Sequence, residues 1–181
     1  MKKNISIIII TFLGVISCTN PNEKAIAEVD ALLVIVEESE NSLLSVDTSI
    51  VFAAKRQMDN DMTEIKMITD TLTREEAFKL DDIFRTRKRF NKITTNYSGF
   101  IHEVEFSKNQ LNNLKQDLEN ELMKKEDFKI HYAKEKEYIM VIKSQINKVV
   151  GGLDEAIEKQ KIDRPTLLEI IENKKLEATN E

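Results

Sequence analysis

The sequence predicts an all-α protein, an elongated antiparallel bundle of three long helices with a short helix at the C-terminus. Only four glycines and two prolines occur in 181 residues, and 33% of the residues are charged, which is typical of long amphipathic helices. Apolar residues recur at alternating three- and four-residue steps, the spacing of helices that pack against other helices. The periodic stretches have nearly equal lengths and short joins, which favours antiparallel neighbours.

The first helix is expected over residues 23–72. Its apolar seam contains Ile26, Val29, Leu33, Val36, Leu43, Ile50 and Ala54. Glu40 and Asp47 interrupt the seam, and the steps then become fours through Met58 and Met62. Such a phase shift changes the local supercoil without ending a helix, so we expect one continuous rod.

The second helix is expected over residues 74–122, beginning at a capping box formed by Thr73 and Glu76. Its seam repeats every seven residues through Ile83, Phe90, Tyr97, Val104, Leu111 and Leu118. Gly99 lies within this repeat and predicts a kink rather than a stop. The run from Ser107 to Gln110 also fits a capping box, which leaves a break between residues 98 and 107 as an alternative.

The third helix is expected over residues 125–160, followed by a short helix over 165–175. Gly151 and Gly152 weaken the long helix near its end, and Pro165 suits the first turn of a new one. Residues 23–181 would form a single helical domain about 75 Å long.

The N-terminus predicts a cleaved signal peptide over residues 1–17. Lys2 and Lys3 precede an apolar stretch from residue 5 to residue 16. Those twelve residues are fewer than the roughly 17 to 25 that a transmembrane helix needs, so a signal sequence fits better.

The motif Val15-Ile16-Ser17-Cys18 contains the only cysteine and resembles the lipobox of bacterial lipoprotein precursors. The resemblance implies a diacylglycerol on the Cys18 sulfur, cleavage before it, and a lipidated tether over residues 18–22. It also implies the outer membrane, periplasmic face favoured, because Thr19 replaces the aspartate of an inner-membrane retention signal. The alternative is an incidental thiol in an ordinary signal peptide. The whole chain is similar to short helix-rich lipoproteins of Bacteroidota, which implies no activity.

The charge of the chain disfavours nucleic acid as a partner. Removal of residues 1–17 takes away Lys2 and Lys3 and no acidic residue, so the net charge changes from −5 to about −7. The net negative charge of such a protein repels the phosphate backbone of a nucleic acid.

The densest basic cluster is a candidate partner-binding site. It comprises Arg85, Arg87, Lys88, Arg89 and Lys92. The cluster would lie in the second helix, close to the end distant from Cys18 and about 50 Å from the membrane, which favours an acidic partner protein or cell-wall carboxylates over lipid headgroups. The alternative is a solvated helix face in which Asp81 pairs with Arg85.

No catalytic residue, cofactor or metal is predicted. The sequence has no G-x-S-x-G motif and no phosphate-binding glycine loop. His102 has Glu105 one helical turn on, but neither His102 nor His131 has a second histidine at i+4, and the chain has no cysteine pair. The expected function is a non-catalytic, lipid-anchored envelope protein that binds or scaffolds a partner protein. The alternative is a periplasmic carrier or chaperone with a hydrophobic ligand between aromatic-rich helices. Its aromatic residues would be Phe78, Phe84, Phe90, Tyr97, Phe100, Phe106 and Phe128.

Overall fold

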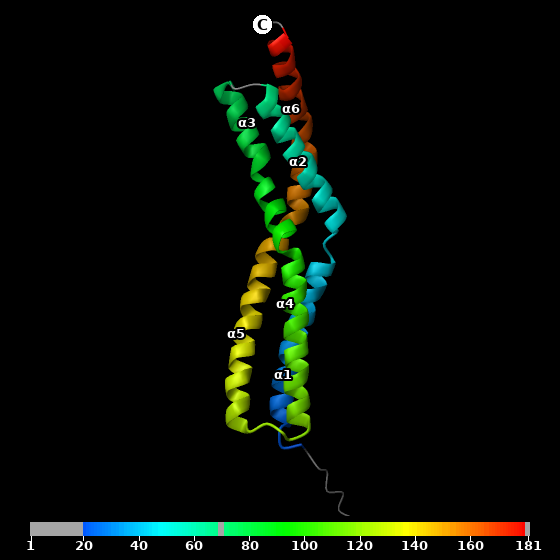
Figure 1. The fold of residues 1–181 in the computed structure, drawn as a ribbon, viewed down its shortest axis with the longest axis vertical. Helices are drawn as coiled ribbons and strands as arrows, with labels where there is room; N and C mark the ends of the chain where they lie inside the picture. The colour runs from blue at the N-terminus through cyan, green and yellow to red at the C-terminus, as the bar shows by residue number, and fades with distance from the viewer. Residues whose placement is uncertain (1–19, 69–70, 180–181) are drawn as a thin grey trace, which may run out of the picture.

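The computed structural model describes residues 20–68 and 71–179, and these residues form six helices and no strand (Figure 1). The helices are α1 (Glu23–Leu44), α2 (Thr48–Ile68), α3 (Arg74–Arg85), α4 (Arg87–Glu119), α5 (Lys125–Val150) and α6 (Leu153–Thr179). The all-α prediction is confirmed. Cys18 and the predicted signal peptide lie outside the described residues.

Each of the three predicted rods is a pair of consecutive helices: α1 with α2, α3 with α4, and α5 with α6 (Figure 1). Ion pairs between α1 and α4 show the relative orientation of these two helices. Asp30 pairs with Lys115 at 2.7 Å and Glu40 pairs with Lys108 at 2.8 Å, so α1 and α4 are antiparallel. At 1.5 Å per residue, α5 and α6 together extend for about 80 Å. The molecule is therefore elongated, as the sequence predicts.

The core consists of three clusters that follow one another along the rod. The first cluster joins α1, α4 and α5, the second joins α2, α4 and α6, and the third joins α2, α3 and α6. The second cluster is built around Phe90, which is completely buried. Its other members are Val51, Ala54, Met58, Ile93, Leu153 and Ala156. The apolar seams therefore do face one another, as their spacing predicts.

The prediction of an unbroken helix over 23–72 is wrong, because α1 ends at Leu44 and α2 begins at Thr48. The Asp47 side chain accepts hydrogen bonds from the backbone N–H groups of Ser49 and Ile50, at 3.0 and 3.1 Å. These bonds satisfy two amides that have no partner inside the new helix. The Ser49 hydroxyl bond, followed by the Ile50 amide bond, lowers the pKa of Asp47. Asp47 thus caps the start of α2, at a position where the sequence shows only an interruption of the apolar seam.

The second rod begins as predicted and breaks where no break was predicted. Thr73 and Glu76 form the capping box, which confirms the start of α3. The break falls at Thr86, whereas α4 continues without interruption through Gly99. The Thr86 hydroxyl is buried and donates to the Ile83 carbonyl at 3.0 Å. Such bonds often bend a helix, but Thr94 makes the same kind of bond inside the continuous α4, so the bond accompanies the junction and does not by itself cause it.

The third rod divides at Gly151 and Gly152, and the predicted new start at Pro165 is wrong. The α6 helix runs from Leu153 to Thr179 with Pro165 in its interior. Proline removes one helical hydrogen bond and normally kinks a helix. Here Leu167 and Ile170, beyond the proline, are buried in the third cluster, so tertiary packing holds the helix through it.

Ser107 offers a test of the packing between α1, α4 and α5. Its hydroxyl is buried without a hydrogen-bond partner in the part of the chain that the structure describes. An unsatisfied buried hydroxyl costs about 1–3 kcal/mol, so Ser107→Ala should raise the free energy of unfolding by about 1 kcal/mol. Urea unfolding of the variant measures this.

Ser39 provides the matched control, because its buried hydroxyl donates to the Ile35 carbonyl at 2.9 Å. Ser39→Ala should therefore leave stability unchanged or lower it. A loss of stability in Ser107→Ala would show that its hydroxyl has a partner.

Candidate functional site

The five residues of the predicted basic cluster lie across the junction between α3 and α4 (Figure 1). The 33 residues of α4 separate this junction from the α4–α5 turn, a distance of about 50 Å. The cluster therefore lies far from that turn. It is nevertheless near the middle of the molecule rather than near its end, because α2, α3 and α6 extend beyond the junction (Figure 1).

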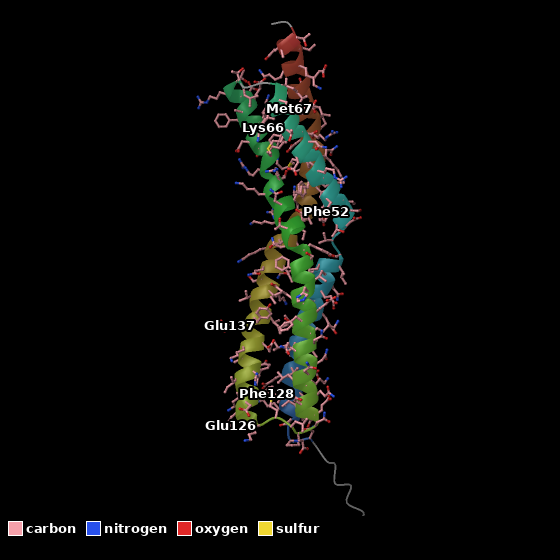
Figure 2. All side chains as sticks on the ribbon, viewed as in Figure 1. Phe52, Lys66, Met67, Glu126, Phe128 and Glu137 are labelled. Carbon is pink, nitrogen blue, oxygen red and sulfur yellow. The ribbon has the colours of Figure 1, made fainter. Side chains whose placement is uncertain are left out.

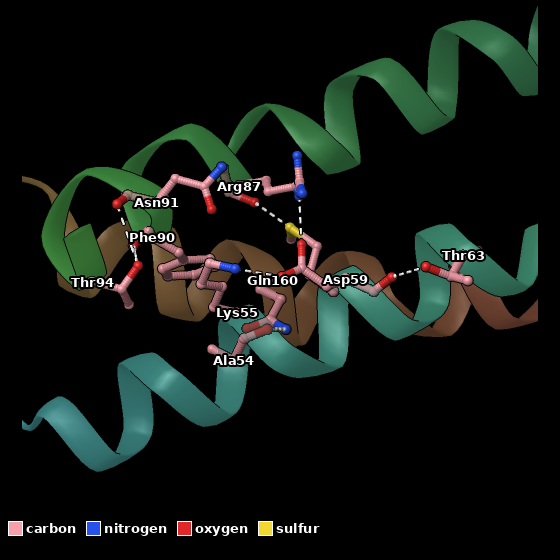
Figure 3. Close-up of polar contacts among 11 residues, drawn as sticks. Ala54, Lys55, Asp59, Thr63, Arg87, Phe90, Asn91, Thr94 and Gln160 are labelled. Carbon is pink, nitrogen blue, oxygen red and sulfur yellow. Dashed lines mark hydrogen bonds and ion pairs between the residues drawn. The ribbon is translucent and has the colours of Figure 1, made fainter.

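Arg87 belongs to the packing between α2 and α4 rather than to an exposed face (Figure 3). Its Nε donates to Asp59 Oδ1 at 2.6 Å, and Lys55 pairs with the other oxygen of the same carboxylate. Burial raises the pKa of Asp59, but the hydrogen bonds from Lys55 and Arg87 outweigh it and hold the pKa below its ordinary value. Arg87 is therefore held in an ion pair within the protein, and we do not count it among the residues that contact a partner.

Arg89 closes the C-terminus of α5. Its Nη1 donates to the Gly151 carbonyl at 2.6 Å, and a cation at that position also interacts favourably with the helix dipole. The next residue, Gly152, has a φ of 72°, in the left-handed region. A Cβ atom on Gly152 would lie 2.9 Å from the same Arg89 nitrogen. Gly152 is therefore required by the backbone and by Arg89 together.

Gly152→Ala and Gly99→Ala should change stability in opposite directions. Left-handed backbone costs an L-residue about 1–2 kcal/mol, so Gly152→Ala should lower the free energy of unfolding by at least about 1 kcal/mol. A Cβ at Gly99 meets no atom within 4 Å, so alanine there should add up to about 1 kcal/mol through helix propensity. Thermal unfolding of both variants checks this. Equal shifts would contradict the break at Gly152.

Four members of the cluster are exposed, and three of them, unlike Arg89, make no bond to another helix. Arg85 is 67% exposed and forms long ion pairs with Asp81 and Asp82, at 3.4 and 3.6 Å. Lys88 and Lys92 are exposed one helical turn apart and form no ion pair within residues 20–68 and 71–179. We call Arg85, Lys88 and Lys92 the basic surface. It borders an open hollow of about 440 Å³, which is lined by Arg85, Thr86, Arg89, Gly152, Glu155, Ala156 and Lys159.

A buried polar contact between α2 and α6 was not predicted from the sequence. Gln160 is buried, and its Nε2 donates to the Ala54 carbonyl at 2.9 Å (Figure 3). One turn further on, Arg164 pairs with the buried Asp61 at 3.2 Å. Helical spacing would have placed Gln160 on the same face as Ala156, and this is the signal that could have identified it. The contact fixes α6 against α2 beside the basic surface.

The aromatic residues of the predicted carrier site do not line one cleft. Phe90, Phe100 and Phe128 are buried in core clusters, whereas Phe78 and Phe106 are exposed. Phe128 contributes to a hollow beside α1 and Phe78 to another beside α6, each without a second ring. Neither of these two hollows is lined by two of the seven rings, so they do not form the aromatic cleft that the carrier alternative predicts.

Metal binding and membrane crossing have no support in the described residues. Within residues 20–68 and 71–179, no group of three or more His, Cys, Asp or Glu side chains is arranged to hold a metal ion. No helix in these ranges is both long enough and apolar enough to span a bilayer.

The comparisons with known proteins add no relative. No family model matches the chain, and neither a curated protein nor a solved structure is significantly similar to it.

Proposed function

We propose that this chain is a non-catalytic, lipid-anchored bacterial envelope protein that binds or scaffolds a partner protein through an exposed helix face. The anchor is a lipid on Cys18, which the lipobox at Val15 to Cys18 supports. The proposed location is the outer membrane, with the periplasmic face favoured.

The position of Asn20 and Asn22 at one end of the rod is the observation that carries the proposal. Asn20 and Asn22 donate side-chain hydrogen bonds to the carbonyls of Glu119 and Leu118, the last residues of α4. Asn20 and Asn22 are therefore fixed at one end of an elongated molecule. An anchor there would make the rod a spacer.

The basic surface supports a protein partner. A lipid on Cys18 would leave Arg85, Lys88 and Lys92 about 50 Å above the bilayer, along the length of α4. This separation exceeds the Debye length of about 8 Å at physiological salt, so the headgroups of the anchoring leaflet do not neutralise them. An acidic patch on a partner protein at that height would neutralise these three cations.

In-cell photo-crosslinking tests the partner. A photoreactive residue at Lys92 should capture one reproducible envelope protein, which mass spectrometry would identify. The matched control is Arg56, an exposed cation on α2 outside the basic surface, and a probe there should not capture the same protein. Equal capture from both positions, or no capture from Lys92, would contradict binding through the basic surface.

A further inference from the structure

The α4–α5 turn and the start of α1 lie together at one end of the rod (Figure 1). The Asn20 Nδ2 donates to the Glu119 carbonyl at 3.2 Å, and the Asn22 Nδ2 donates to the Leu118 carbonyl at 2.9 Å. Two further bonds within the segment, from the backbone amides of Asn22 and Glu23 to Asn20, fix its conformation. The chain therefore enters the fold beside the turn.

Cys18 precedes Asn20 by only two residues. An extended chain spans at most about 3.6 Å per residue, so two residues are a tether of at most about 7 Å between a lipid-bearing cysteine and Asn20. A lipid on Cys18 consequently brings the α4–α5 turn to the bilayer surface.

The turn itself exposes an apolar side chain. The Leu122 amide donates to the Asp117 carbonyl at 2.8 Å and the Glu121 amide donates to the Leu118 carbonyl at 3.2 Å, the two bonds of a Schellman cap. Glu121 has a φ of 56° in the position that usually holds glycine. The residue after it normally packs back onto the helix, but Leu122 is 74% exposed. The cap therefore presents a leucine at the end of the molecule.

Exposed lysines surround this end. They are Lys24, Lys124, Lys125 and Lys129, and none forms an ion pair within the described ranges. In the middle of α4, by contrast, Lys108 and Lys115 are both paired. Acidic residues such as Glu121 and Glu126 lie among the exposed lysines, so the end is not cationic overall. Its affinity for a lipid surface must therefore come mainly from Leu122.

We propose that the α4–α5 turn is a membrane-contact surface, in which Leu122 enters the headgroup region of the bilayer that holds the Cys18 lipid. The inference rests on the proposed anchor. The ammonium groups of the surrounding lysines reach the lipid phosphates, while their aliphatic stems lie beside Leu122 in the headgroup region. The lipid and the turn then form two points of attachment, which hold the rod upright and keep the basic surface at a fixed height.

A fluorophore at the turn tests the contact. Lipidation occupies the sulfur of the only cysteine, so Lys124→Cys in the full lipidated chain provides one free thiol for an environment-sensitive dye two residues from Leu122 and leaves the leucine in place. The control is Met67→Cys, which is 76% exposed at the opposite end of the rod (Figure 2). Both proteins are reconstituted in vesicles of phosphatidylethanolamine and phosphatidylglycerol.

On vesicles, the dye at position 124 should shift its emission to the blue, be quenched by nitroxide-labelled lipids and resist aqueous iodide. The dye at position 67 should behave as it does in water. Vesicle-bound protein whose two dyes are equally accessible to iodide would overturn the membrane contact and leave the anchor intact. Wild-type protein that does not float with vesicles and reacts with the dye at Cys18 would overturn the anchor and the contact together.

Discussion

Replacing Phe90 by alanine should lower the free energy of unfolding by about 3–5 kcal/mol, the usual cost of truncating a buried aromatic side chain. Phe90 is completely buried and joins α4 to α2 and α6 in the second core cluster. The other buried members of the cluster are aliphatic or methionine side chains, and removing the ring would leave a cavity among them. Small domains have only about 5–15 kcal/mol of stability, so the variant should be severely destabilised.

Equilibrium urea unfolding followed by circular dichroism measures this effect. Phe78→Ala is the matched control, because Phe78 is 66% exposed and its only described ring contact is Arg74, 5.6 Å above the ring. An exposed cation–π contact is worth about 0.5–1 kcal/mol, so the control should lose no more than this. Similar losses from both variants would show that the second cluster is not packed as described.

Replacing Cys18 by alanine should release the protein from the membrane and abolish labelling by an alkyne fatty acid. Two acyl chains give stable anchoring because each buried methylene contributes about 0.8 kcal/mol. Because the lipid is the proposed anchor, its loss should move most of the protein to the soluble fraction.

Cell fractionation and fatty-acid labelling of the same cultures check the outcome. Thr19→Ala is the control, because it changes the neighbouring residue and leaves Val15 to Cys18 intact. That variant should remain membrane-bound and labelled. Retention of Cys18→Ala in the membrane with unchanged labelling would sink the proposed anchor.

The sequence predicts the helices well and their breaks poorly. Apolar spacing identifies the faces that pack, since residues such as Leu111 and Ile146 are completely buried, and the Thr73 capping box marks the start of α3 correctly. At Thr86 the seven-residue repeat continues from Ile83 to Phe90, so a bend that preserves the phase leaves no trace in the pattern. The threonine bond at this junction gives no signal either, because Thr94 makes the same kind of bond inside the continuous α4.

The role of each cation in the basic cluster depends on residues distant in the sequence. Arg87 meets Asp59, 28 residues away, and Arg89 meets Gly151, 62 residues away. The density of charge along the chain reveals neither partner. The sequence therefore does not distinguish the paired cations of the cluster from the unpaired ones. Pro165 shows the same limit, because the packing of Leu167 and Ile170 overrides its local preference.

Intact mass spectrometry of the protein purified from membranes tests the central claim most directly. The account predicts a mature chain that begins at Cys18 and carries the mass of a diacylglycerol, with further acylation of the new amino group. A chain that retains residues 1–17, or that begins elsewhere without lipid, would contradict the anchor and the upright arrangement that depends on it.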